Sequence, residues 1–232
     1  MSDPKHVIEF RDITKTYKMG ENEFQALKGI SFVVDKGDMV AIIGPSGSGK
    51  STTMNIIGLL DSATTGTYIL NGKDVTSLSN RDRASVRNQE IGFIFQSFFL
   101  LPRLTALQNV LLPLLYRGLD KKEASKRAMA MLKRVEMDKH SHHKPSELSG
   151  GQQQRVAIAR ALVGNPSIVL ADEPTGALDQ KTGEAVMGLL KELNHEEGAT
   201  VVVITHDIEI ANQLPRRIPI VDGVITEKSA WI

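Results

Sequence analysis

The sequence contains no cysteine and no long hydrophobic run. Without cysteine the chain can form neither a disulfide nor a thiolate metal site, which fits a reducing compartment. The longest apolar stretches, residues 98–101 and 110–116, fall far short of the roughly 20 apolar residues that a membrane-spanning helix needs. The start, Met-Ser-Asp-Pro-Lys-His, carries an early acid and leads into no apolar segment, so we expect no secretory signal. We therefore expect any action at a membrane to take place from outside the bilayer.

Neither sign of charge is in excess. The chain has 28 Lys and Arg against 27 Asp and Glu, whereas nucleic-acid binding usually calls for a basic excess or a basic stripe. We therefore expect no nucleic-acid partner. A length of 232 residues suits one large α/β domain, or a domain with an inserted lobe, and no repeat or linker divides the chain. We predict a single folding unit over residues 1–232.

A glycine-rich loop follows an expected strand at residues 39–43 and opens an expected helix at residues 51–60. Its sequence, Gly-Pro-Ser-Gly-Ser-Gly-Lys-Ser, has the P-loop pattern, in which glycines let backbone N–H groups wrap phosphates closely. The helix N-terminus adds partial positive charge. We expect Lys50 to reach the β- and γ-phosphates of a nucleotide and the Ser51 hydroxyl to ligate Mg²⁺. The predicted phosphate-binding residues are Gly44, Pro45, Ser46, Gly47, Ser48, Gly49, Lys50, Ser51 and Thr52.

Short β-branched runs alternate with helical patterns along most of the chain. The expected strands are residues 39–43, 91–95, 167–171 and 200–204. The last two are continuous apolar runs, typical of parallel strands that are covered on both faces. Apolar residues recur on one face in segments 121–135 and 182–193, which predicts amphipathic helices.

Antiparallel strands are expected near both ends. Residues 7–13 and 25–34 predict one pair, joined through residues 18–22, and Asp222-Gly223 is a strong two-residue hairpin signal between residues 218–221 and 224–226. The segment from about residue 81 to 145 is mainly helical and could form a separate lobe. We predict an α/β fold: a P-loop NTPase core with a mostly parallel sheet, an N-terminal antiparallel β subdomain and an inserted α-helical subdomain.

Two carboxylates close the apolar run at residues 168–171. In a P-loop fold this is where a carboxylate should hold Mg²⁺ through its water shell, a role we assign to Asp172. If the strand continues, the side chain of Glu173 points to the opposite face, where it could polarise a water for attack on the γ-phosphate. A solvated pair of acids at a strand end is the alternative, and the phosphate loop makes the catalytic interpretation the stronger one.

A second Ser/Gly-rich segment, Ser149-Gly150-Gly151-Gln152, precedes a helical stretch at residues 156–162. Ser and Gly at a helix N-terminus form an anion-binding arrangement of the same physical kind as the phosphate loop. One chain does not need two γ-phosphate-binding segments for a single nucleotide. We therefore expect this segment to bind the nucleotide of a second copy.

With these motifs in order, the chain resembles the ATP-binding cassette (ABC) ATPases of transporters over essentially its whole length. The resemblance implies roles for four further residues. Gln96 is similar to the glutamine that touches Mg²⁺ and the transporter contact, and Asp179 to the aspartate of a loop that crosses the dimer interface. His206 resembles the histidine that senses the γ-phosphate, and Tyr17 the aromatic residue that stacks on adenine. With Glu173, the implied catalytic residues are His206 and Gln96, and the implied cofactors are ATP and Mg²⁺.

The resemblance narrows to the lipoprotein-release (LolD-type) and macrolide-export (MacB-type) ATPases on the segments around residues 55–61, 91–110 and 174–179. It implies a homodimer that closes on two ATP and drives a separate permease, which would place the chain at the cytoplasmic face of the cell membrane. The apolar residues 98–101 are expected either to belong to the docking surface or to the core of the helical lobe. We consider two alternative functions. A regulatory ATPase that signals to cell-wall enzymes has a nearly identical cassette. Proteins of the family that act on ribosomes or nucleic acid usually carry two cassettes per chain or a long coiled coil.

Overall fold

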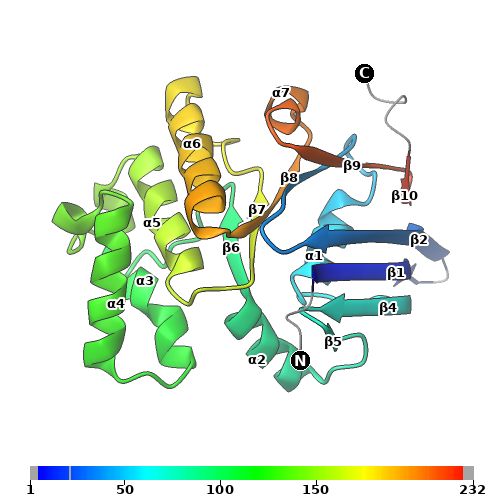
Figure 1. Ribbon diagram of the computed structural model, residues 1–232, viewed down its shortest axis with the longest axis horizontal. Helices are drawn as coiled ribbons and strands as arrows, with labels where there is room; N and C mark the ends of the chain where they lie inside the picture. The colour runs from blue at the N-terminus through cyan, green and yellow to red at the C-terminus, as the bar shows by residue number, and fades with distance from the viewer. Residues whose placement is uncertain (1–4, 21, 227–232) are drawn as a thin grey trace.

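Two β-sheets organise the part of the chain that the structure, a computed structural model, describes: residues 5–20 and 22–226 (Figure 1). Residues 1–4, on which the expectation of no secretory signal partly rests, lie outside these ranges. Glu21, in the expected connection between the first two strands, also lies outside them. Helices lie on both sides of the larger sheet, and the smaller sheet lies at the opposite end of the molecule from α3 and α4 (Figure 1).

The larger sheet has the strand order β10-β9-β3-β8-β7-β6. Its strands are β3 (Met39–Ile43), β6 (Ile91–Phe95), β7 (Ile168–Asp172), β8 (Thr200–Thr205), β9 (Arg216–Val221) and β10 (Val224–Ile225). All neighbours are parallel except β9 and β10, which form the predicted hairpin. The register pairs Ile43 with Thr205, and Asp172 with both Ile204 and Phe95. The carboxyl ends of β3, β6, β7 and β8 therefore meet at one edge of the sheet.

The smaller sheet is antiparallel, with the order β2-β1-β4-β5. It comprises β1 (His6–Met19), β2 (Asn22–Asp35), β4 (Thr65–Leu70) and β5 (Lys73–Asp74). The first two strands confirm the predicted pair, whereas β4 and β5 were not predicted. Gly66 in β4 has φ 94°, and a Cβ there would lie 2.4 Å from the Asp12 carbonyl oxygen. Glycine is therefore required where β4 passes close to β1.

The helices are α1 (Lys50–Ile57), α2 (Asn80–Glu90), α3 (Ala106–Tyr116), α4 (Lys121–Arg134), α5 (Gly150–Leu162), α6 (Gln180–Glu197) and α7 (Ile208–Asn212), with short 3₁₀ turns at Asp138–His140 and Pro145–Glu147. In α4 the predicted apolar face is buried through Ala124, Ala128 and Leu132, and the Asp120 side chain caps the helix. None of the described helices has both the length and the hydrophobicity that crossing a bilayer requires.

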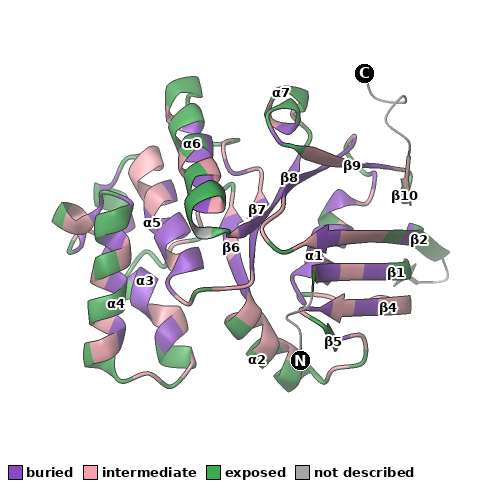
Figure 2. Ribbon diagram, viewed as in Figure 1, coloured by how far each residue is buried: buried purple, intermediate pink, exposed green. Residues whose placement is uncertain are grey.

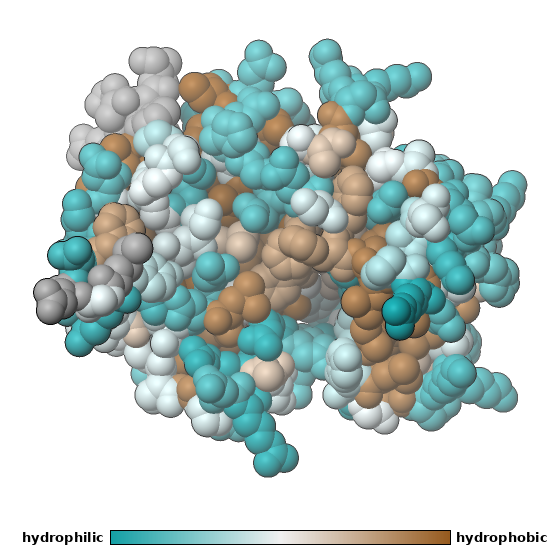
Figure 3. Space-filling view, turned by 180° about the vertical axis from the view of Figure 1, so that it is seen from behind, coloured by the Kyte–Doolittle hydropathy of each residue, from teal (hydrophilic) through white to brown (hydrophobic). Residues whose placement is uncertain are grey.

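Helices α3, α4 and α5 pack against one another and form a helical lobe (Figure 1). The segment predicted as a helical lobe, about residues 81–145, includes β6, which pairs with β7 in the larger sheet. In the view from behind, a hollow separates the helical lobe from the core, and hydrophobic side chains gather beside it (Figure 3).

The larger sheet is buried on both faces, which explains its continuous apolar runs (Figure 2). Successive residues of a strand enter opposite cores. Ala41 packs with the helical lobe and with α6, whereas Val40 and Ile42 pack with α1 and the smaller sheet. Burying each isoleucine or valine of this kind contributes about 1.5–3 kcal/mol to folding. The candidate site lies at the carboxyl edge of this doubly buried sheet.

Candidate active site

The phosphate loop connects the end of β3 to the start of α1. Gly47 and Gly49 adopt φ 78° and 105°, in the left-handed region that glycine enters without strain. A Cβ at Gly44 would lie 2.0 Å from the Ile220 carbonyl oxygen and 2.8 Å from the Ser48 Oγ. The loop therefore needs glycine at position 44 for space and at positions 47 and 49 for conformation.

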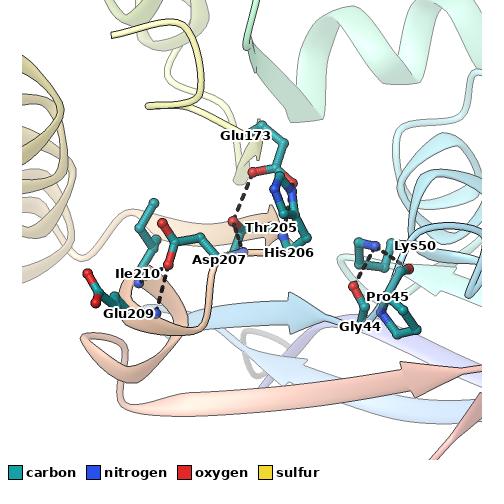
Figure 4. A network of polar contacts seen from close by, with 9 residues as sticks. All are labelled: Gly44, Pro45, Lys50, Glu173, Thr205, His206, Asp207, Glu209 and Ile210. Atoms are coloured by element: carbon teal, nitrogen blue, oxygen red, sulfur yellow. Dashed lines mark hydrogen bonds and ion pairs between the residues drawn. The ribbon is translucent and has the colours of Figure 1, made fainter. Parts of the chain in front are cut away.

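Lys50 lies within this loop. Its Nζ donates hydrogen bonds to the carbonyl oxygens of Gly44 at 2.7 Å and Pro45 at 2.8 Å (Figure 4). Burial lowers the pKa of Lys50, and the negative charges of Glu173 and Asp172 oppose that shift. The Ser48 hydroxyl is buried and, within residues 5–20 and 22–226, has no hydrogen-bond partner. A buried cation and an unpartnered hydroxyl in a glycine cradle fit a nucleotide phosphate chain.

Asp172 ends β7 beside this loop and is half-buried. Burial raises its pKa, the charge of Glu173 adds to the rise, and the charge of Lys50 opposes it. A half-buried carboxylate beside a second negative charge is stabilised by a nearby cation. With the exposed Ser51 hydroxyl on the first turn of α1, it supplies the oxygen ligands that suit Mg²⁺ when phosphates and water complete the set.

Glu173 does not continue β7. The predicted direction of its side chain assumed that the strand continues, and this assumption is wrong. Its φ is 44°, so the chain turns sharply after Asp172. Its carboxylate is held instead by the last residue of β8 and the residue after it: Thr205 Oγ1 donates to Oε2 at 2.9 Å, and the His206 backbone N–H donates to Oε1 at 2.9 Å (Figure 4). The His206 ring Nδ1 lies 2.5 Å from the same Oε1. The structure thus brings the predicted pair, Glu173 and His206, into direct contact.

Exposure separates the roles of these two side chains. The Glu173 side chain is 17% exposed, whereas that of His206 is 73% exposed. Thr205 is fully buried, and its hydroxyl also accepts the Asp207 N–H at 3.0 Å. Thr205 was not predicted; the available signal was a hydroxyl residue closing an apolar strand immediately before His206. The result is a fixed carboxylate beside a histidine that is open to the surroundings.

Gln96 follows β6 and reaches the same edge. A Cβ on Gly176 would lie 2.7 Å from the Gln96 Nε2, so the amide packs directly against the turn that carries Glu173. Gln96 therefore lies beside the loop that follows Glu173, and its predicted contact with Mg²⁺ stays a prediction.

Tyr17 lies in β1, and its hydroxyl donates to the Asp61 carboxylate at 2.9 Å. Lys15 Nζ donates to the other Asp61 oxygen at 2.7 Å and lies 4.8 Å from the centre of the Tyr17 ring. Burial raises the pKa of Tyr17, a hydrogen bond with the Thr52 side chain opposes the rise, and Asp61 adds to it. These contacts tie the ring to α1 and to the segment after it, close to the phosphate loop. Neither Lys15 nor Asp61 was predicted.

Ser149 caps α5. Its hydroxyl accepts the Gln152 backbone N–H, and its own N–H donates to the Gln152 Oε1 at 2.9 Å, a reciprocal capping box. A Cβ on Gly151 would lie 2.5 Å from the Thr182 Cγ2, so α5 begins against the start of α6. Asp179 caps α6, and hydrogen bonds from the Thr182 hydroxyl and N–H lower its pKa.

The Ser149 segment and the phosphate loop belong to opposite sides of the larger sheet. Helix α5 packs with the helical-lobe core through Val156 and Ile158, whereas α1 packs with the core of the smaller sheet through Met54 and Ile57. The structure therefore does not bring the two anion-binding helix ends of one chain together.

The family model described as ABC transporter matches residues 27–176, more than half of the chain. The chain belongs to the ABC transporter family. Macrolide export ATP-binding/permease protein MacB of Syntrophobacter fumaroxidans is 50% identical over 97% of this chain. The ABC transporter ATP-binding protein MJ0796 of Methanocaldococcus jannaschii is 52% identical over 94% of this chain and 95% of its own length. YknY of Bacillus subtilis is 50% identical over 97% of both chains.

Solved structures similar to this chain belong to the same family. The dimeric structure of the MJ0796 cassette has a TM-score of 0.86 at 50% identity and covers 95% of this chain and 97% of its own. The MJ0796 dimer in a post-hydrolysis state, bound to ADP and Pi, has a TM-score of 0.87 at 48% identity and covers 97% of this chain and 99% of its own. The predicted fold and resemblance are confirmed: this ABC cassette is an ATPase that binds ATP with Mg²⁺. The chain spans about a third, 32%, of the MacB relative.

Proposed function

We propose that two copies of this cassette close on two ATP molecules and drive a separate permease of the macrolide-export or lipoprotein-release type. The observation that carries the dimer is the position of residues 149–151 on the far side of the sheet from the phosphate loop of the same chain. A helix N-terminus there can complete a nucleotide site only in another copy. The dimeric MJ0796 cassette, at 50% identity, supports this arrangement.

The proposed roles combine this geometry with the family resemblance. Lys50 and the loop hold the phosphates, Tyr17 stacks on adenine, and Ser51, Asp172 and Gln96 hold Mg²⁺. Glu173 polarises the attacking water, a kind of assistance typically worth about 10²–10⁴-fold in rate. His206 contacts the γ-phosphate. The second copy contributes Ser149, Gly150, Gly151 and Gln152 at the phosphates and Asp179 at the interface.

The permease docks in the hollow between the core and the helical lobe. This cavity of about 860 Å³ is lined by α2, β6 and α3, with the aromatic rings of Phe95, Phe99 and Tyr116 in its wall. Phe99 is 63% exposed and Tyr116 76%, which favours the docking interpretation of residues 98–101 over a core one. The MacB relatives, whose printed name includes a permease, support a membrane partner, and through it a place at the cytoplasmic face of the membrane.

Size-exclusion chromatography with Mg-ATP tests the shared site. Glu173→Gln keeps the turn and its donors but removes the base, so ATP should accumulate in a stable dimer. Ser149→Arg on the same background should abolish that dimer and leave the ATP affinity of the monomer unchanged within about threefold, because the segment acts in the other copy. A Glu173→Gln protein that stays monomeric with Mg-ATP, or a Ser149→Arg monomer that no longer binds ATP, contradicts the shared site.

A further inference from the structure

Gln154 is a fully buried polar residue in α5, one turn beyond the Ser149 cap. Its Nε2 donates a hydrogen bond of 2.7 Å to the carbonyl oxygen of Pro174, the residue after Glu173. Its Oε1 is also buried and finds no hydrogen-bond partner in the described part of the chain. A half-satisfied buried amide costs stability that an apolar residue would not. The bond to Pro174 therefore calls for a reason beyond folding.

The turn that receives this bond is an unusual one. Glu173 has φ 44°, a left-handed conformation that is costly for a side chain with a Cβ and that the surrounding structure must hold in place. Within the turn, the Glu173 carbonyl oxygen accepts the Gly176 N–H at 3.0 Å, and that of Thr175 accepts the Leu178 N–H at 3.0 Å. The Pro174 carbonyl oxygen is instead held from outside the turn, by Gln154.

We propose that Gln154 is a positioning residue for ATP hydrolysis. By fixing the Pro174 carbonyl it keeps the turn in the conformation that places the Glu173 carboxylate against Thr205 and His206. The inference rests on the proposed function, because α5 also carries the Ser149 segment. When that segment binds the ATP of the second copy, any shift of α5 is transmitted by the hydrogen bond from Gln154 to Pro174. It thereby reaches the turn that carries the catalytic carboxylate of its own chain. Gln154 thereby connects the two nucleotide sites of the dimer.

Gln154→Met tests the assignment, since methionine matches the length of glutamine without its polar atoms. A loosened carboxylate should lower kcat by about 10- to 100-fold, the loss that a misplacement of about 1 Å produces. The KM for ATP and the ATP affinity of the monomer should change by less than about threefold, because Gln154 is remote from the phosphate loop of its own chain. The matched control is Gln153→Met: Gln153 is half-buried, and its Nε2 donates to Leu148 near its own helix start at 3.1 Å. It should retain kcat within about twofold.

A double-mutant cycle separates positioning from a general structural role. On the Glu173→Gln background there is no carboxylate to position, so Gln154→Met should reduce the residual rate by less than about twofold. The same 10- to 100-fold loss on both backgrounds would overturn the proposal. Gln154→Asn, one methylene shorter, provides a second variant that keeps the amide but withdraws it from Pro174, and it should lose kcat in the same way.

The outcomes distinguish this inference from the proposed function. If Glu173→Gln forms the ATP dimer while Gln154→Met and Gln154→Asn turn over at the wild-type rate, the positioning role alone is wrong. If Glu173→Gln forms no dimer, the shared site is wrong, and the cycle still reports whether Gln154 acts through Glu173. Thermal unfolding of each variant identifies a rate loss that comes from unfolding, and such a loss counts against the positioning role if both Gln154 variants show it at the assay temperature.

Discussion

The Glu173 carboxylate and the His206 backbone N–H are joined by a hydrogen bond of 2.9 Å at the point where β7 and β8 end side by side. The imidazole Nδ1 approaches the same oxygen, and the Thr205 hydroxyl donates to the other one. A backbone donor and a buried hydroxyl cannot swing away as a long side chain can. The carboxylate is therefore preorganised for the water it is proposed to polarise, before any nucleotide-dependent movement.

Thr205→Val removes one of these donors at nearly constant volume. The variant leaves Glu173 Oε2 without the hydroxyl that holds it at 2.9 Å, and the Asp207 N–H loses its acceptor. We expect kcat for ATP hydrolysis to fall by about tenfold with KM nearly unchanged, less than the roughly 10²–10⁴-fold contribution of a general base, because the His206 N–H still holds the carboxylate. Phosphate release at saturating Mg-ATP measures the effect. Thr205→Ser keeps the hydroxyl and should stay within about threefold of wild type; an equal loss in both variants would point to packing instead.

The glycines of the phosphate loop are predicted to differ in what they tolerate. Gly44→Ala forces a Cβ to within 2.0 Å of the Ile220 carbonyl oxygen, a backbone atom of β9 that cannot move alone. We expect a loss of about 3 kcal/mol in the free energy of unfolding, the upper range for overpacking. Gly47→Ala meets nothing within 4 Å and is opposed only by its φ of 78°, a cost of about 1 kcal/mol. Urea unfolding compares the two, and Gly47→Asn, which enters the left-handed region more readily, should lose less than Gly47→Ala. Equal losses at positions 44 and 47 would contradict the steric argument.

The sequence predicts the larger sheet well because its strands are buried on both faces and therefore appear as unbroken apolar runs. Asp172, which ends such a strand, could be placed at its edge for the same reason, whereas His206, one residue beyond β8, was assigned through the family resemblance. Contacts that depend on a single backbone conformation could not be predicted. The left-handed φ of Glu173 turns its side chain toward Thr205, and no local pattern announces it. Gln154 was equally hidden, because its partner is a carbonyl oxygen, a group that every residue has.

Asp61 should make stability depend on pH at the acid end. Burial raises its pKa, but hydrogen bonds from Lys15, Ser62 and Tyr17 and the charge of Lys15 outweigh burial, so the pKa lies below its ordinary value. A depressed folded pKa means that the ionised form is favoured by folding. Its contribution is present above the unfolded pKa of about 3.9 and is lost as pH falls through the folded pKa.

Asp61→Asn should therefore lower the free energy of unfolding at pH 7 by about 2 kcal/mol, the typical worth of hydrogen bonds to a charged group. The difference from wild type should shrink as the pH is lowered below about 4, because the wild-type carboxyl then protonates. Urea unfolding between pH 3 and pH 7 measures both curves. Glu192→Gln changes an exposed carboxylate of α6 and should alter stability by less than about 0.5 kcal/mol. If the difference in unfolding free energy between Asp61→Asn and wild type did not change with pH, the ion pair between Lys15 and Asp61 would not be its cause.

Arg160 holds the segment that follows Gln96. From α5 its guanidinium donates to the carbonyl oxygens of Phe99 at 2.5 Å and Phe98 at 2.8 Å, and both phenylalanines have positive φ, 45° and 60°. Two consecutive left-handed residues with large side chains are strained. Because the guanidinium binds both carbonyl groups, it opposes relaxation of this segment toward ordinary backbone angles.

Arg160→Met should release the segment. We expect amide hydrogen exchange of residues 97–101 to accelerate by at least about tenfold, while exchange in β7 and β8 stays within about twofold of wild type, since opening of this loop is local. Arg127→Met is the matched control, because Arg127 makes an exposed ion pair with Glu123 at 2.7 Å along α4, a type worth only about 0.3–0.5 kcal/mol. It should leave exchange of residues 97–101 unchanged. Unchanged exchange in Arg160→Met would mean that Phe98 and Phe99 are held by the packing of their rings, and Arg160 would then have no part in shaping the proposed docking surface.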